Sequence, residues 1–259
     1  MQMFFAKLGK YQPCGIFSFE HIILLLITVL AIRVAIQKTN LKDLSKIKKK
    51  IRDVTSIVWG LEIIKIIFNL LTGNANNINT YIPLYYCSIL LYAGIFSSIG
   101  KGIIKRIGDV FLATGSIVGG AVFLILPTTS ITMYPVFHYI SIQSFIYHGT
   151  MIYLGIIINK SNYVEIKNKD IIYYAGLILS VCIIAYIVNS ICGSNLMFIS
   201  KDFPQTPITI IYHLTKSYFP IVMSALQAIL QIYAVLYSKK YIEKQLVKKD
   251  EKIVYQISN

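Results

Sequence analysis

Residues 171–191 read IIYYAGLILSVCIIAYIVNSI, without a single charged side chain. As an α-helix this stretch is about 32 Å long, which is enough to cross the roughly 30 Å hydrocarbon core of a bilayer. A helix suits that environment because it satisfies its own backbone hydrogen-bonding groups where no water is available. The stretch therefore predicts a transmembrane helix.

Similar apolar runs occur along most of the chain. Its 259 residues are 56% hydrophobic and 14% charged, with a mean hydropathy of +0.64, whereas soluble domains carry about 25% charged residues. Seven helices are expected near residues 18–38, 53–72, 81–100, 107–127, 139–159, 171–191 and 217–238. The sequence thus predicts an all-α, polytopic transmembrane helical bundle that forms a single integral membrane domain over residues 1–259.

The net charge of +14 is distributed unevenly between the two sides of this bundle. Residues 38–52, 101–106, 160–170 and a basic tail at 239–259 hold 19 Lys and Arg residues, and the alternate loops hold only 4. Because basic loops stay in the cytoplasm, we expect the N-terminus outside and the C-terminus inside. The basic loops are expected to face anionic lipid headgroups at the cytoplasmic face of a cell membrane, the bacterial plasma membrane. This distribution argues against a nucleic-acid partner.

Residues 82–87, IPLYYC, begin the third predicted helix. Pro83 is expected in the first turn, where its missing N–H does no harm. Cys87 would then lie about 9 Å below the outer end of the helix. A lone cysteine in a membrane helix usually packs as a small hydrophobic residue, so packing and a chemical role both remain open.

The fifth predicted helix carries Ser141, Ser144 and His148 on one face, with His138 at its outer end. His148 is expected about 14 Å deep, in the same half of the bilayer as Cys87. A histidine at that depth could accept a proton from a thiol and raise its nucleophilicity. The alternative is an interhelical hydrogen bond.

The second predicted helix places Glu62, Lys65 and Asn69 on one face. Glu62 and Lys65 can neutralise one another, or one of them can contact a substrate headgroup or orient a catalytic group. The four cysteines show no spacing typical of a metal site, so neither a metal nor a cofactor is expected.

Several short motifs together resemble one family of membrane proteins. IPLYYC is similar to the LPLHLC-type motif of YwaF-like bacterial integral membrane proteins, with Tyr85 or Tyr86 where that motif commonly has a histidine. Further matches are Trp59 and Glu62, Phe137 and His138, Tyr147, His148 and Gly149, and GSNLMF at 193–198 followed by Lys201, Pro204 and Pro207. The resemblance extends in order over nearly the whole chain.

This family is related to transmembrane protein 164, an acyltransferase of ether phospholipids, and more distantly to the androgen-induced-gene hydrolases. The resemblance implies a membrane-embedded lipid acyltransferase or acyl-ester hydrolase. Cys87 would be its nucleophile, His148 its base, and a membrane phospholipid or other acyl lipid its substrate. His138 and Glu62 are candidates for substrate contacts, and Asn195, Tyr86 and Ser88 for stabilising the oxyanion. The alternative functions are a transporter or a lipid-binding or accessory membrane protein without catalysis.

Overall fold

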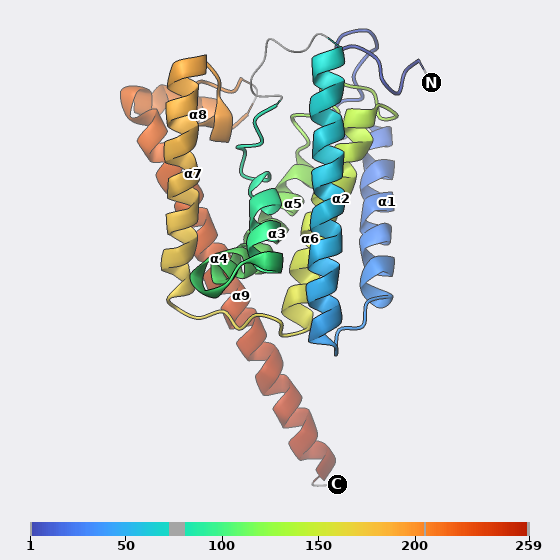
Figure 1. Cartoon of the computed structure of the whole chain (residues 1–259), viewed down its shortest axis with the longest axis vertical. Helices are drawn as coiled ribbons and strands as arrows, with labels where there is room; N and C mark the ends of the chain where they lie inside the picture. The colour runs from blue at the N-terminus through green and yellow to red at the C-terminus, as the bar shows by residue number, and fades with distance from the viewer. Residues whose placement is uncertain (1, 73–80, 205, 258–259) are drawn as a thin grey trace.

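The protein is a helical bundle with the proportions of a membrane protein. The computed structural model describes residues 2–72, 81–204 and 206–257, and all regular secondary structure in these ranges is helical. Six helical segments are long and apolar enough to cross a membrane, and a further apolar helix, Ile89–Ile99, is shorter. The predicted all-α transmembrane bundle is therefore confirmed (Figure 1).

The described residues form nine α-helices and two short 3₁₀ turns. The helices are α1 (Phe19–Gln37), α2 (Leu44–Leu71), α3 (Ile89–Ile99), α4 (Gly102–Ala113), α5 (Gly115–Ile125), α6 (Tyr139–Lys160), α7 (Asp170–Cys192), α8 (Ile208–Thr215) and α9 (Phe219–Ile257). The 3₁₀ turns are η3 (Leu196–Phe198) and η4 (Lys216–Tyr218).

The basic loops gather at one end of the bundle, which we call the basic end. Successive spans alternate in direction, so residues 38–43, 100–101 and 161–169 lie at the same end as the projecting part of α9 (Figure 1). The N-terminal segment lies at the opposite end. Assignment of the basic end to the cytoplasm stays a prediction from the charge pattern.

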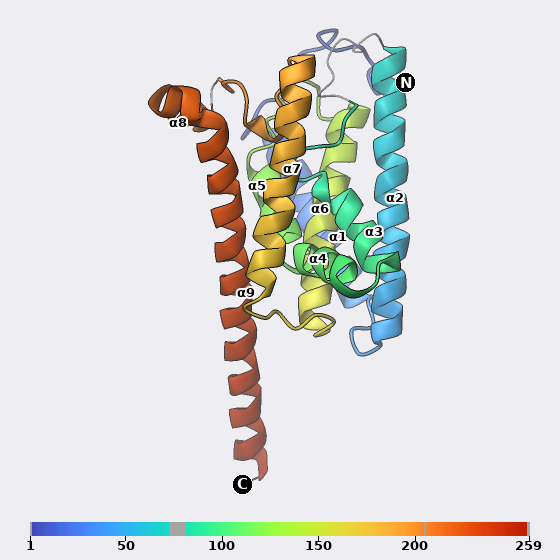
Figure 2. The same ribbon diagram turned by 60° about the vertical axis from the view of Figure 1, so that its left-hand side comes forward.

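Four of the predicted helices have wrong boundaries. The second helix begins at Leu44 rather than near residue 53. The third helix begins at Ile89 rather than near residue 81, and the fourth is divided into α4 and α5 at Thr114, whose φ of −127° and ψ of −69° are not helical. The last helix continues through the basic tail to Ile257 and extends beyond the other helices (Figure 2). In each case the apolar run indicates where the chain lies in the membrane but not where its backbone is helical.

Local side-chain contacts define several helix ends. The Ser18 hydroxyl accepts a hydrogen bond from the His21 amide at the start of α1. Asp43 accepts from the amides of Ser45 and Lys46 at the start of α2. Such caps satisfy amides that have no partner within the helix. At the other end of α7, Gly193 adopts the left-handed conformation with φ of 65°, which suits glycine at this position.

α6 lies at the centre of the bundle and contacts α1, α2, α4 and α5. Its polar residues Ser141, Ser144 and His148 are all buried. The polar face predicted for the fifth span therefore points into the protein, as expected of polar groups at membrane depth.

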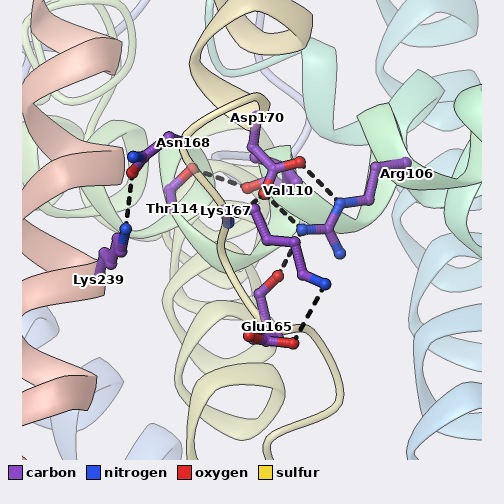
Figure 3. Close-up of polar contacts among 8 residues, drawn as sticks. All are labelled: Arg106, Val110, Thr114, Glu165, Lys167, Asn168, Asp170 and Lys239. Atoms are coloured by element: carbon purple, nitrogen blue, oxygen red, sulfur yellow. Dashed lines mark hydrogen bonds and ion pairs between the residues drawn. The ribbon is translucent and has the colours of Figure 1, made fainter.

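An ion pair at the basic end attaches α4 to α7 (Figure 3). Arg106 Nε donates to Asp170 Oδ1 at 2.8 Å, and the same guanidinium bonds the second carboxylate oxygen and the Glu165 carbonyl. Asp170 also accepts from the Lys167 amide at 2.5 Å and is completely buried. A buried carboxylate with this many donors holds the two helices in a defined register.

Removal of the arginine leaves that carboxylate buried without its cation. We expect Arg106→Ala to lower the free energy of unfolding by about 3 kcal/mol, because an unpaired buried charge is costly. Equilibrium unfolding in mixed micelles measures this change. The matched control is Arg52→Ala, whose exposed side chain lies 3.9 Å from Asp53 and should contribute less than about 1 kcal/mol. Equal effects of the two substitutions would contradict the proposed importance of the buried pair.

Candidate active site

The chain before α3 crosses the upper half of the bundle in Figure 1 without forming a helix. Residues 82–84 have no regular structure, and turns at 86–88 lead into α3. The estimate of about 9 Å for the depth of Cys87 assumed a helix that begins near residue 81, whereas α3 begins at Ile89. Pro83 begins no helix and lies in the non-helical part, where the Leu84 amide donates to the Ile82 carbonyl at 2.8 Å.

Cys87 lies between α5 and α6 at the end of this segment. Its Sγ is 3.8 Å from the Gly119 carbonyl oxygen on α5, and its own carbonyl accepts a hydrogen bond from Tyr147 Oη on α6 at 3.1 Å. The Leu90 amide donates to the same carbonyl at 3.1 Å. The half-buried cysteine is thus held by contacts with two central helices.

His148 lies on α6 with its ring stacked against Phe123 of α5, at a centroid separation of 3.5 Å. Its Nδ1 is 2.6 Å from the Ser144 carbonyl oxygen. A carbonyl only accepts, so this contact places the proton of the neutral ring on Nδ1. Nε2 is then the unprotonated nitrogen, which is the form that a general base requires.

Cys87 and His148 contact α5 about one helical turn apart, at Gly119 and Phe123. Four residues of helix correspond to about 6 Å along the axis. No hydrogen bond joins the two side chains within the described part of the chain, where each instead contacts a backbone carbonyl. The structure brings the two predicted residues to one region of α5 without direct contact.

Glu62 and Lys65 form the ion pair predicted for the second span. Lys65 Nζ is 2.6 Å from Glu62 Oε1, and the glutamate side chain is almost completely buried. The pair lies on α2, which contacts α6.

Tyr86 packs over the small residues at the start of α5. Its Oη donates to the Gly115 carbonyl at 3.2 Å, and its ring covers Gly119. The absence of side chains at Gly115 and Gly119 leaves the space that this aromatic ring occupies. Tyr174 and Gln231 also reach Gly115. No sequence signal distinguishes Tyr174, whereas Gln231 belongs to a polar face of the last predicted helix.

His138 and Asn195 have local structural partners. His138 is completely buried; its Nε2 bonds the Ala6 carbonyl at 3.0 Å, and its Nδ1 accepts from the Ile140 amide at 3.1 Å. Asn195 bonds the amides of Ser200 and Lys201 within its own loop. Both ring nitrogens of His138 are engaged by the protein, so the predicted headgroup contact has no free ring nitrogen to use.

No group of three or more His, Cys, Asp or Glu side chains that could hold a metal ion is found among residues 2–72, 81–204 and 206–257. The possible reactive groups described above are therefore a thiol, an imidazole and a carboxylate–ammonium pair.

The fold and the site define a polytopic helical membrane protein with a polar interior where two central spans are interrupted. Residues 16–237 match the family model of the TMEM164 family, and the chain belongs to this family. Comparison with curated proteins and with solved structures finds no match. The resemblance to YwaF-like proteins and to the androgen-induced-gene hydrolases stays a prediction.

The close packing against Gly115, directly after the break between α4 and α5 at Thr114, can be tested by substitution. A Cβ atom at this position would lie 1.9 Å from Tyr174 Oη, so we expect Gly115→Ala to destabilise the protein, by about 1–3 kcal/mol as in other overpacked cores. Gly176→Ala on α7 is the matched control because nothing lies within 4 Å of its Cβ position. Thermal unfolding of both variants measures the difference, and similar midpoints would contradict the close approach.

His138 predicts a pH dependence of stability. Burial lowers the pKa of its imidazole below the usual 6.5, although the hydrogen bond to Ala6 acts in the opposite direction. The unfolded chain therefore takes up this proton first, and the stabilising contribution is lost as the pH falls below 6.5 towards the folded-state pKa.

We expect His138→Asn to reduce the fall in melting temperature between about pH 8 and about pH 5, because asparagine caps the helix without titrating in this range. His213→Asn is the control, since His213 is exposed. A fall of the same size in the His138 variant and in the unmodified protein would show that His138 does not cause it.

Proposed function

We propose that this protein is a membrane-embedded lipid acyltransferase or acyl-ester hydrolase that uses Cys87 as its nucleophile and His148 as its base. The observation that carries the proposal is the placement of the Cys87 thiol and the unprotonated His148 nitrogen on one region of α5, deep within the bundle. Membership of the TMEM164 family supports it, because the resemblance to an acyltransferase implies the same pair of residues.

In the proposed reaction His148 Nε2 takes the proton of the Cys87 thiol, either directly after rotation of the cysteine side chain or through one water. The thiolate attacks the carbonyl carbon of an acyl ester, a C–S bond forms, and the C–O bond to the leaving alcohol breaks. The histidine returns its proton to the departing oxygen. An acceptor hydroxyl or a water then attacks the thioester and regenerates the thiol, which gives acyl transfer or hydrolysis.

The interior position of the thiol is consistent with a lipid substrate. Val122, Ile125 and Leu126, on and just after the last turns of α5, are exposed apolar side chains adjacent to Phe123. An acyl chain can therefore approach this helix from the hydrocarbon region without passing through water. Glu62 and Lys65, on α2 beside α6, are proposed to contact the polar part of the substrate.

A transport function is the alternative that one observation favours. Spans interrupted near the middle of the membrane are typical of transporters, in which the freed backbone groups bind the transported solute. In this structure the interruptions before Ile89 and at Thr114 have that character. If the protein is a transporter without catalytic activity, removal of the Cys87 thiol should leave the transport rate unchanged.

The test uses purified protein in vesicles containing a phospholipid with a labelled acyl chain and a lysolipid acceptor. We expect Cys87→Ala and His148→Ala each to reduce transfer and hydrolysis by at least about 100-fold, the size of effect typical of nucleophile and base loss. Cys192→Ala is the matched control because this cysteine is exposed. Trapping of a labelled thioester on Cys87 would identify the intermediate.

Equal release of the label by the parent protein and both variants would remove the proposed mechanism. Uptake of a solute by vesicles with Cys87→Ala at the parent rate would favour the transport alternative.

A further inference from the structure

Two polar side chains from the far side of the bundle meet the residue that precedes Cys87. Gln231 of α9 donates a hydrogen bond from Nε2 to Tyr86 Oη, which itself donates to the Gly115 carbonyl at 3.2 Å. Gln231 is completely buried, and Tyr174 of α7 is nearly so. The Gln231 contact connects α9 with the non-helical segment through the Tyr86 hydroxyl, and Tyr174 of α7 lies against the same glycine, Gly115.

The three side chains converge on a single point at the start of α5. An ideal Cβ on Gly115 would lie 1.9 Å from Tyr174 Oη, 2.8 Å from Gln231 Oε1 and 2.9 Å from Tyr86 Oη. Tyr174 Oη and Gln231 Oε1 make no hydrogen bond of normal geometry with any described residue. One is a donor and the other an acceptor, so a small rotation of either side chain joins them in a chain from Tyr174 through Gln231 to Tyr86.

Such a chain matters because the turn at residues 86–88 lies between the start of α3 and its neighbours α5 and α6. The amides of Ile89 and Leu90 donate to the Tyr86 and Cys87 carbonyls at 3.2 and 3.1 Å and attach the turn to α3. The hydroxyl of Tyr86 attaches the same turn to α5, and that of Tyr147 attaches it to α6.

We propose that Gln231 and Tyr174 are positioning residues that orient the Cys87 thiol through Tyr86. The expected effect of these residues on catalysis rests on the proposed function. Their effect on the orientation of the Cys87 side chain does not. Loss of the Tyr86 hydroxyl contacts releases the turn at residues 86–88 from α5 and α9 while its backbone hydrogen bonds to α3 remain, and the distance from Cys87 Sγ to the Gly119 carbonyl then increases. The placement of α9 against α7 and α5 is thereby coupled to the reactivity of the thiol.

The test measures the rate of Cys87 alkylation by N-ethylmaleimide in membranes. The other cysteines are removed by Cys14→Ser, Cys182→Ala and Cys192→Ser, so only one thiol reacts. Tyr86→Phe, Gln231→Leu and the double variant are compared with the single-cysteine parent. Tyr86→Phe keeps the ring over Gly119 and removes only the hydroxyl. Tyr233→Phe on the same helix is the control because this side chain is exposed.

We expect each single substitution to raise the alkylation rate by about fivefold, the equivalent of one lost hydrogen bond, and the double variant to add nothing further. The control should react at the parent rate. In the acyl-transfer assay the single variants should lower kcat and leave KM unchanged, because orientation of the nucleophile, and not substrate affinity, is affected.

Alkylation rates within about twofold of the parent in both single variants, or effects that multiply in the double variant, would overturn the proposal. If Gln231→Leu does not fold, as judged by its melting temperature, Tyr174→Phe replaces it. The alkylation rates of Tyr86→Phe, Tyr174→Phe and their double variant are then compared in the same way. Alkylation as expected in a parent protein without acyl-transfer activity would remove the proposed function and leave the positioning role in place.

Discussion

The structure depends on one constraint, that a polypeptide interrupted inside a membrane must find partners for its backbone groups within the protein. Two interruptions lie side by side here, before α3 and between α4 and α5. Asn159 of α6 donates to the Ala113 carbonyl at 2.5 Å, where α4 ends. Tyr147 donates to the Cys87 carbonyl and Tyr86 to the Gly115 carbonyl. The polar side chains around the two interruptions therefore serve first as hydrogen-bond donors to the backbone carbonyls there.

The same constraint explains why groups capable of chemistry collect in one place. A segment without helical pairing exposes carbonyl oxygens, which attract hydroxyl and amide donors from the surrounding helices. Small residues of α5 leave room for this segment, so that Tyr86 and the thiol approach Gly115 and Gly119.

The buried histidines illustrate the difference between structural and potentially reactive groups. His21 accepts from the Phe17 amide and contacts the Leu124 carbonyl, so both of its ring nitrogens have backbone partners. His138 likewise uses both nitrogens. His148 differs, because only its Nδ1 has a hydrogen-bond partner among the described residues. A ring held by one nitrogen and by stacking on Phe123 is oriented and still has an acceptor available.

The sequence by itself determined the all-α membrane class and the face on which Ser141, Ser144 and His148 lie, because hydrocarbon requires long apolar runs and directs polar groups inward. It predicted seven spanning helices, whereas six helical segments of the described residues are long and apolar enough to cross a membrane. It also indicated Cys87 and His148 through a resemblance that membership of the TMEM164 family supports in part. It did not indicate that the third predicted span is not helical before Ile89 or that the fourth divides at Thr114, since apolar composition is compatible with a helical or a non-helical backbone. Only the tertiary structure decided those points, because an interrupted backbone is tolerated where Tyr147, Asn159 and Tyr86 from other parts of the chain supply its hydrogen bonds.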